Sequence, residues 1–303
     1  MEDRLNGMIL GSLVGDSLSL GAHGIYDTDR IKHEFGTIKD ITAPPKDSFH
    51  KNKTAGEHTH YGDQTLFLLK NIYENAGFDS EHFKNNWLLF MNSYNGYIDS
   101  ATEKTLENMN SNKNPSGSDS DDMAGASRIA PIMLYYYSNI EKVVEFSIQQ
   151  TKTTHNNKLV VDISKFFAYM LFYVLRGDNP QAAIKKASDI FDREYIINQY
   201  VNMAFESCDD NSIDTIRRFG QECSAKGAFP SALHIIIKYH DDFEKALVQN
   251  VMSGGDSAAR ALIIGAVLGA YKGESAIPKR WLKEMKSYGD VITIIGSKAS
   301  QPL

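Results

Sequence analysis

The sequence has little cysteine, no excess of positive charge and no long hydrophobic run. Among its 303 residues only Cys208 and Cys223 are cysteines, too few for a disulfide framework, which favours a reducing, intracellular compartment. A formal net charge of -6 argues against a basic surface for nucleic acid. The most apolar window, residues 261–271, is too short to span a bilayer, and no apolar signal core follows the first residues. These absences predict a cytoplasmic protein without nucleic-acid or membrane partners.

Hydrophobic residues recur at helical spacing through most of the chain. One such face predicts a helix over residues 158–176. Polar residues that favour helix starts, namely Asp63, Asp79 and Asn179, precede other helical stretches. No long alternating pattern typical of strands competes with these helices. The sequence therefore predicts an all-α fold of roughly ten or more helices, in a single domain spanning residues 1–303.

Two polar stretches predict loops. Residues 36–62 contain two adjacent prolines, several lysines and three histidines, and residues 110–122 are polar enough to form a linker. Long polar loops in a compact helical chain are either functional or disordered. At the end of the second stretch, Ser118 and Asp119 precede two more acids, which repel one another unless a cation or a helix N-terminus offsets their charge. The alternatives are a ligand site and an acidic capping segment in solvent.

Further polar residues border the predicted helices. Asp16 lies among small residues, where a buried carboxylate is costly unless it is paired, so it predicts either a site or a hydrogen-bonded structural role. Arg128 could neutralise the nearby acids or bind a ligand phosphate. His155 lines a cleft or belongs to a capping loop. His58 and His60 alternate as a metal-binding pair does, and the alternative is that both are solvated loop residues.

The most informative motif is Gly-Gly-Asp-Ser-Ala-Ala-Arg at residues 254–260, which opens an apolar stretch. A double glycine followed by aspartate at a helix start typically brings a backbone turn and a carboxylate to a ligand or ion. Here Asp256 is followed by two alanines, which cannot coordinate anything, and then by Arg260. Farther along, Gly265 and Gly269 have the spacing of a close helix contact.

Five segments in order along nearly the whole chain resemble the ADP-ribosylglycohydrolase family, which includes the dinitrogenase-reductase-activating glycohydrolases and the J1 crystallins of jellyfish lenses. Three of these segments are most similar in sequence to the J1-crystallin branch. They read His-Tyr-Gly-Asp-Gln-Thr, Ser-Asp-Ser-Asp-Asp and Gly-Gly-Asp-Ser-Ala-Ala-Arg. The segments that carry the resemblance are residues 15–18, 61–65, 118–131, 154–155 and 254–269.

The resemblance implies an orthogonal bundle of helices around a central cleft, in which two Mg²⁺ ions hold the ribose hydroxyls of ADP-ribose. In hydrolysing members a Thr-Asp-Asp run and an Asp-x-Asp-Thr run supply the cation ligands. These runs fall on residues 62–64 and 256–259, where only Asp63 and Asp256 keep a carboxylate. Gln64 keeps an uncharged oxygen, and the other positions lose their donor. The resemblance therefore implies at most a weak magnesium site at Asp63 and Asp256.

Arg260 lies one helical turn from Asp256, on the same face. We expect its guanidinium to occupy the former metal region and to pair with Asp256 and Asp63. The alternatives are that it binds a phosphate or ribose group, or that it is exposed to solvent.

Three functions are compatible with this resemblance. The first is a catalytically impaired pseudoenzyme of the J1-crystallin type, a structural protein of the eye lens. The second is an active or altered hydrolase that releases ADP-ribose from protein or small-molecule acceptors. The third is a non-catalytic binder of ADP-ribose or a related nucleotide, with Arg128 and Arg260 as anion contacts. A shared fold does not transfer activity when site residues differ, so the lost ligands favour the first. No residue is assigned as general acid or base.

Overall fold

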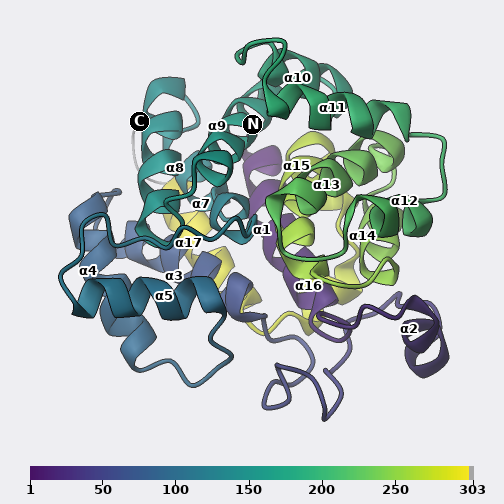
Figure 1. Cartoon of the computed structure of the whole chain (residues 1–303), viewed down its shortest axis with the longest axis horizontal. Coiled ribbons are helices and arrows are strands. Elements are labelled where there is room, and N and C mark those ends of the chain that lie inside the picture. Colours follow the sequence, from purple (N-terminus) through teal and green to yellow (C-terminus); the bar gives the residue numbers. More distant parts are fainter. Residues whose placement is uncertain (300–303) are drawn as a thin grey trace.

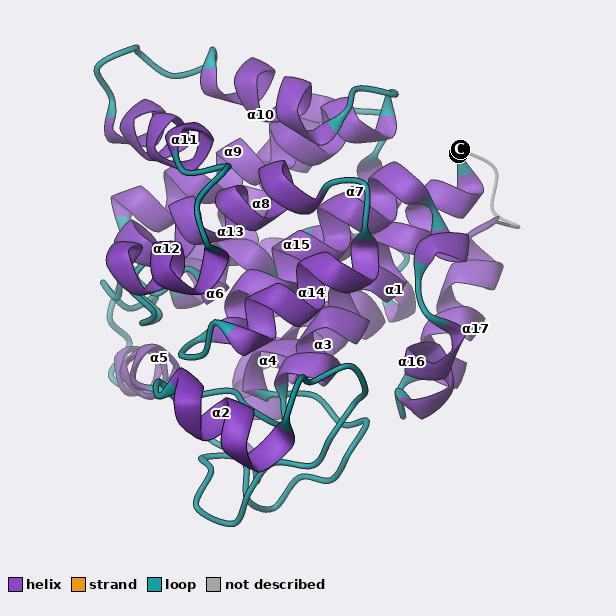
Figure 2. Ribbon diagram, turned by 90° about the vertical axis from the view of Figure 1, so that its right-hand side faces the viewer, coloured by secondary structure: helices purple, strands orange, loops and turns teal. Residues whose placement is uncertain are grey.

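The computed structural model describes residues 1–299, which contain helices and no strand (Figure 2). This confirms the all-α prediction. The elements are α1 (Glu2–Ser19), α2 (Thr28–Phe35), α3 (His60–Glu74), α4 (Ser80–Asn92), α5 (Ser100–Asn110), α6 (Ala124–Ser127), α7 (Ala130–Tyr136), α8 (Ile140–Thr154), α9 (Lys158–Leu175), α10 (Pro180–Ser188), α11 (Ile196–Glu206), α12 (Ser212–Phe219), α13 (Ala225–Tyr239), α14 (Phe243–Met252), α15 (Ser257–Lys272), the 3-10 turn η1 (Glu274–Ala276), α16 (Lys279–Glu284) and α17 (Tyr288–Ala299).

Helices α1 and α15 lie side by side at the centre of the molecule (Figure 1). Nearly all residues of α15, and of α1 after its first turn, are buried, as expected for helices enclosed by others. The two helices approach closely because glycines of α15 face the backbone of α1. A Cβ at Gly265 would collide with the carbonyl oxygen of Gly11, and a Cβ at Gly269 would collide with that of Gly7. The predicted packing role of Gly265 and Gly269 is therefore confirmed.

A second, smaller hydrophobic cluster holds α3 and α4 against α7. Leu68 and Ile72 of α3 contribute to it, together with Trp87 of α4 and Ile132 of α7, and all four are buried. This packing sets the direction in which α3 leaves the central helix pair, and it thereby positions the first turn of α3. None of the described helices is both long and apolar enough to cross a membrane.

Helix starts were predicted correctly where a cap precedes an exposed helix. Asp79 and Asn179 cap α4 and α10 through side-chain oxygens that accept backbone N–H groups. The prediction that Asp63 caps a helix is wrong, because α3 begins earlier and Thr59 is its cap. Tyr61 donates its backbone N–H to the Thr59 hydroxyl over 3.2 Å.

The predicted linker at residues 110–122 is part of the packed structure. The backbone N–H of Ser118 donates to the Thr154 carbonyl oxygen over 3.0 Å, and that of Asn156 donates to the Ser118 carbonyl over 2.7 Å. Farther along, the backbone N–H of Ala225 donates to the Asp121 carbonyl over 2.7 Å. These contacts fasten the segment to the end of α8 and to the start of α13. The prediction of a linker is therefore wrong at this end of the segment.

Candidate functional site

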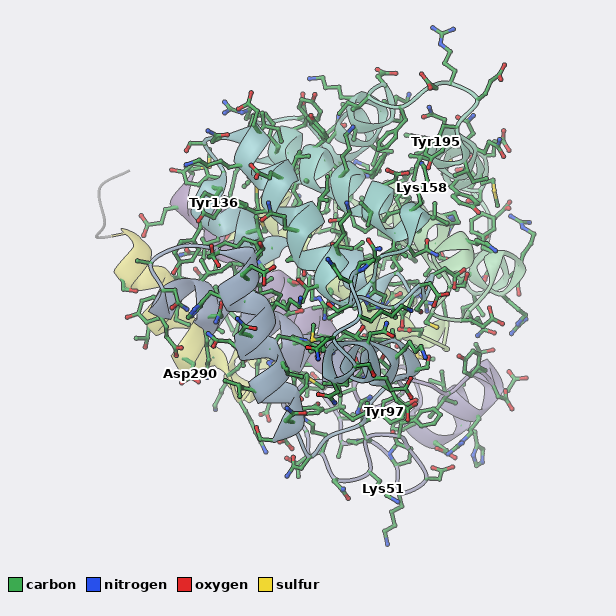
Figure 3. All side chains as sticks on the ribbon, turned by 60° about the vertical axis from the view of Figure 1, so that its left-hand side comes forward. Lys51, Tyr97, Tyr136, Lys158, Tyr195 and Asp290 are labelled. Carbon is green, nitrogen blue, oxygen red and sulfur yellow. The ribbon has the colours of Figure 1, made fainter. Side chains whose placement is uncertain are left out.

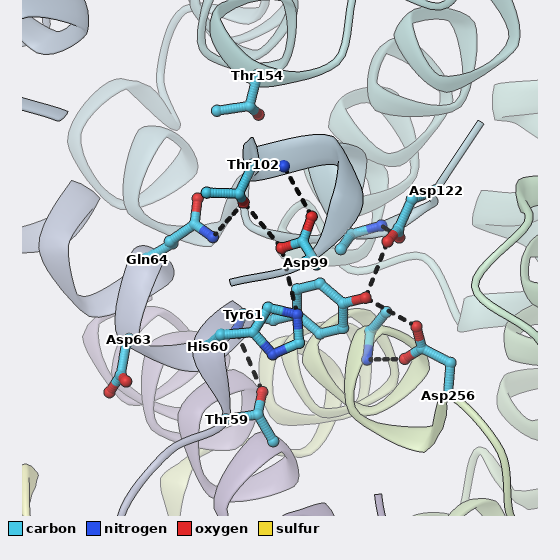
Figure 4. A network of polar contacts seen from close by, with 12 residues as sticks. Thr59, His60, Tyr61, Asp63, Gln64, Asp99, Thr102, Asp122, Thr154 and Asp256 are labelled. Atoms are coloured by element: carbon cyan, nitrogen blue, oxygen red, sulfur yellow. Dashed lines mark hydrogen bonds and ion pairs between the residues drawn. The ribbon is translucent and has the colours of Figure 1, made fainter. Parts of the chain in front are cut away.

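Tyr61, in the first turn of α3, lies between two buried carboxylates (Figure 4). Its hydroxyl oxygen is 2.8 Å from Oδ2 of Asp122 and 3.0 Å from Oδ2 of Asp256. Asp122 ends the 111–122 loop, and Asp256 caps α15 by accepting the N–H of Ala259 over 3.2 Å. The phenol therefore joins three segments that are far apart in the sequence. Nothing in the sequence pattern identified this role of Tyr61.

Two hydrogen bonds between the Tyr61 hydroxyl and the two carboxyl groups require two protons. A phenol carries one proton, so both contacts are hydrogen bonds only if one carboxyl group is protonated. Burial and the nearby charge of Asp256 raise the pKa of Asp122 well above its usual range. Burial also raises the pKa of Tyr61. The raised pKa makes Asp122 the carboxyl group of this trio that takes up a proton as the pH falls.

We predict that Asp122→Asn gains stability relative to the native chain as the pH rises. A carboxyl group whose folded pKa is raised stabilises the fold fully below its unfolded pKa, near 3.8, and loses that contribution as the pH rises toward the folded pKa. Asparagine resembles the protonated carboxyl group and does not titrate. The difference in free energy of unfolding should grow by up to about 1.4 kcal/mol per pH unit as the pH rises from the unfolded pKa toward the folded pKa. Urea unfolding at several pH values measures it, with exposed Asp119→Asn as control. A difference independent of pH would contradict the assignment.

Asp16 holds the start of α3 against α1. Its fully buried carboxylate accepts the backbone N–H of Thr59 over 2.9 Å, the Thr59 hydroxyl over 2.5 Å and the N–H of Gly62 over 3.1 Å. The ring of His58 is 3.2 Å from the same carboxylate and 2.7 Å from the Ser287 hydroxyl. Of the two alternatives for Asp16, the structure shows hydrogen bonding between helices. His58 is likewise buried, and neither of its nitrogens is free.

Gln64 and Arg128 form a buried polar network on the opposite side of α3 from Asp16. The Gln64 side-chain oxygen accepts from the Arg128 guanidinium over 2.6 Å and from the Trp87 indole over 3.0 Å. Arg128 also donates to Gln150 over 3.2 Å and to the Thr154 hydroxyl. No described carboxylate forms an ion pair with Arg128, and burial lowers its pKa to about 10. The guanidinium is held by neutral oxygens.

Asp63 points away from this network. Its Oδ2 atom is 2.5 Å from the Lys53 ammonium group and 2.5 Å from the Tyr94 hydroxyl, and the side chain is 18% exposed. Asp256 lies on the far side of Tyr61 (Figure 4). The structure therefore does not bring together the two carboxylates that the sequence placed in one candidate metal site.

Arg260 is fully buried, so it is not the solvent-exposed arginine of the alternative interpretation. Its guanidinium donates to Asn250 Oδ1 over 2.9 Å and to the carbonyl oxygens of Gly254, over 2.6 Å, and Gln221, over 3.4 Å. Among the described residues it has no carboxylate partner, so the predicted ion pairs with Asp256 and Asp63 are wrong. The left-handed turn at Gly254 and the following glycine turns the Gly254 carbonyl oxygen toward the guanidinium, which donates to it.

The remaining candidates lie between the 111–122 loop and the end of α8. Ser118 is buried and donates its hydroxyl to the Thr154 carbonyl over 2.9 Å. The ring of His155 is 2.8 Å from the Thr154 hydroxyl, and burial, aided by the charge of Arg128, lowers the pKa of His155 to about 3. Asp119 is exposed and lines an open cleft of about 600 Å³. Ser118 and His155 thus belong to the loop attachment, whereas Asp119 faces solvent.

Three further histidines gather beside Tyr61. His23 follows α1, His50 lies in the loop before α3, and His60 is the first residue of α3. All three are buried, and one nitrogen from each lies within 4.8 Å of the others. Burial lowers the pKa of His23, and it lowers that of His50 to about 2. The sequence indicated His60 through its alternation with His58, but the partners in the structure are His23 and His50.

The comparison with protein families agrees with this fold. A family model described as ADP-ribosylglycohydrolase matches residues 1–301. The chain belongs to the ADP-ribosylglycohydrolase family. A solved structure named ADP-ribosylglycohydrolase-related protein complex superposes with a TM-score of 0.74 at 22% identity, covering 99% of this chain and 98% of that one, which shows a shared fold.

Proteins similar to this chain include two crystallins. Crystallin J1A of Tripedalia cystophora is 25% identical over 96% of this chain and 94% of its own length. Crystallin J1B of the same organism is 25% identical, with coverage of 93% and 92%. An uncharacterized protein of Archaeoglobus fulgidus is 27% identical, with coverage of 94% and 92%. The resemblance to the family, and the relation to J1 crystallins, are therefore confirmed.

Proposed function

We propose that this chain is a catalytically impaired, J1-crystallin-like member of its family, with a structural role in place of ADP-ribosyl hydrolysis. The observation that carries the proposal concerns the two carboxylates left at the positions of the family's cation ligands. The Asp63 carboxylate accepts hydrogen bonds from Lys53 and Tyr94, and the Asp256 carboxylate accepts one from Tyr61. Each carboxylate has protein partners, and Tyr61 lies between the two.

The chemistry of the site does not suit a pair of Mg²⁺ ions. Mg²⁺ needs octahedral oxygen ligands and gives up its water reluctantly, so it depends on anionic oxygens that face one another. At Gln64 the oxygen accepts from a buried guanidinium, which places a positive charge where a cation would bind. At Gly62 any side chain would meet the buried Asp16 carboxylate, so the threonine of the family pattern does not fit beside Asp16 as it stands.

We predict no magnesium-dependent release of ADP-ribose from peptides ADP-ribosylated on arginine or serine. The expected rate with millimolar Mg²⁺ equals the rate without it and the rate of the double variant Asp63→Asn/Asp256→Asn. An active hydrolase of the family, assayed in parallel, shows that the peptides are competent. Release that increases with Mg²⁺ and disappears in the double variant would overturn the proposal.

A separate measurement tests the non-catalytic alternative. ADP-ribose that binds the folded state must raise the melting temperature with increasing ligand concentration. The structural proposal predicts no such increase. A saturable increase that is reduced by Arg128→Gln would instead support a nucleotide binder, in which the buried guanidinium contacts the ligand.

A further inference from the structure

The histidines His23, His50 and His60 are buried but lack the hydrogen bonds that buried imidazoles normally have. Neither nitrogen of His50 has a hydrogen-bond partner among the described residues, and neither does Nδ1 of His23 or of His60. Nε2 of His60 has one polar neighbour, the Asp99 carboxylate at 3.3 Å. The exposed fractions of the three residues are 7%, 1% and 1%. The imidazole rings of His50 and His60 stack at 5.2 Å between centroids, and His23 lies 5.4 Å from His50.

Two other buried histidines, His58 and His234, have partners at both nitrogens, and buried His155 has one at Nδ1 only. The two nitrogens of His234 are each 2.9 Å from a serine hydroxyl, those of Ser207 and Ser212. Both nitrogens of His58 are likewise in contact with side-chain oxygens. Unsatisfied buried polar groups are rare in folded proteins, and each one calls for an explanation such as a bound water or ion. Several that converge on one point indicate a ligand that binds all of them.

We propose that His23, His50 and His60 bind one divalent transition ion of the zinc class. Three imidazole nitrogens are a ligand set for Zn²⁺ and neighbouring transition ions, whereas Mg²⁺ prefers oxygen. Around a tetrahedral ion with Zn–N distances of about 2.0–2.1 Å, the nitrogens lie roughly 3.3 Å apart. The present separations are all within 4.8 Å, so the rings need to move inward by no more than about an ångström on binding.

Two carboxylates stand where they can orient the imidazoles. Asp99 Oδ2 is 3.3 Å from Nε2 of His60, and Asp256 Oδ1 is 3.8 Å from Nδ1 of His23. A ligating histidine commonly donates its other N–H to a carboxylate, which fixes the ring and strengthens the ligand. Asp99 is itself held by the Thr102 hydroxyl and backbone N–H, each over 2.8 Å. Their negative charge also offsets part of the charge of a bound cation.

A surface cavity borders the histidine cluster. His50 lines a cavity of about 290 Å³ together with Phe49, Lys53 and Tyr97, and the ring of Tyr97 packs edge-on against His50 and His60. Tyr97 and Lys51 lie at the same edge of the molecule (Figure 3). Three protein ligands leave a fourth position of a tetrahedral ion for a water or another small ligand from this cavity. The site is independent of the proposed loss of the magnesium pair.

The test is metal binding by the full-length chain after removal of metals with a chelator. We expect one equivalent of Zn²⁺ in a calorimetric titration, and a visible absorption spectrum typical of four-coordinate cobalt when Co²⁺ is added. Zinc at about 100 times its Kd should raise the melting temperature by roughly 4 °C. Absence of saturable binding of both ions would overturn the proposal.

Variants locate the ion. His50→Ala should weaken Zn²⁺ binding at least about 100-fold and abolish the cobalt spectrum, and Asp99→Asn should weaken it by about 10-fold to 100-fold. The exposed His82→Ala is the matched control and should bind like the native chain. His23→Gln and His60→Gln provide independent tests if His50→Ala does not fold, as judged by circular dichroism with chelator.

A second cluster of metal-binding residue types lies nearby, and the same experiment distinguishes it. Asp122, Cys223 and Asp256 also bring ligand atoms within 4.8 Å of one another, although Tyr61 already bridges the two carboxylates. Cys223→Ser should leave zinc binding unchanged. Zinc binding that is lost in Cys223→Ser and retained in His50→Ala would place the ion in that cluster and overturn the proposal. Neither result alters the expected outcome of the hydrolysis assay.

Discussion

Replacing Asp16 with alanine should reduce the free energy of unfolding by about 3–5 kcal/mol. The carboxylate is fully buried and accepts three hydrogen bonds, two from Thr59 and one from the backbone of Gly62. Alanine cannot accept them, so buried donors at the start of α3 lose their partner and gain no water. The His58 ring loses the same carboxylate. The effect is large because one side chain satisfies several donors at once.

Urea unfolding followed by far-UV circular dichroism measures this loss. Asp16→Asn retains one acceptor oxygen and should lose less than Asp16→Ala. Asp27→Ala is the matched control: Asp27 also accepts two backbone N–H groups, at the exposed start of α2, and its removal should cost only about 1 kcal/mol. Equal losses in the free energy of unfolding for Asp16→Ala and Asp27→Ala would contradict this prediction, because burial of the carboxylate would then have no effect.

The helical fold could be predicted from the sequence because its signals are local. The predicted helix over 158–176 corresponds to α9, and the caps at Asp79 and Asn179 depend on residues a few positions away. Asp63 shows where local signals fail. Its residue type suits a helix cap, but α3 begins at His60 because Asp16, far away in the sequence, binds the segment around Thr59. Tertiary contacts decided the boundary.

The candidate site depended even more on contacts between distant segments. Asp63 and Asp256 both keep the family's carboxylate, yet Lys53 and Tyr94 draw Asp63 away from Asp256. Lys53 lies in a loop for which the sequence predicts no conformation, so its ion pair could not be inferred. The sequence likewise placed Arg260 on the same helical face as Asp256, but it did not show that backbone carbonyl oxygens would be within reach of the guanidinium.

The histidine cluster illustrates the same limit. His23 and His60 come from either side of the long early loop, and His50 comes from within it. No fixed spacing relates them, because the loop's path is set by its packing against the start of α3. The spacing of His58 and His60 indicated a pair, yet the two imidazoles serve different neighbours: His58 contacts Asp16 and Ser287, and His60 faces His50. The alternation of His58 and His60 along the chain therefore did not predict which histidines lie together in the structure.

Adding a single methyl group at Gly265 should destabilise the fold by about 3 kcal/mol or more. The new Cβ of Gly265→Ala would meet the backbone carbonyl of Gly11 on α1, and backbone cannot rotate away as a side chain can. Helices α1 and α15 would have to separate, and the residues that each presents to the rest of the core would lose contacts. Alanine favours helix more than glycine does, so local propensity predicts the opposite sign.

The matched control is Gly289→Ala in α17, where no atom lies within 4 Å of the added Cβ. That substitution should stabilise the chain by about 0.4–1 kcal/mol, because it restricts the unfolded state without a clash. Thermal and urea unfolding of both variants measure the difference. Because Asp256 caps α15 and α1 carries Asp16, a shift of these helices also moves two carboxylates of the site. Gly265→Ala should therefore weaken zinc binding as well, whereas Gly289→Ala should leave it unchanged. If both variants unfold at the same urea concentration, the close approach of α1 and α15 does not limit stability.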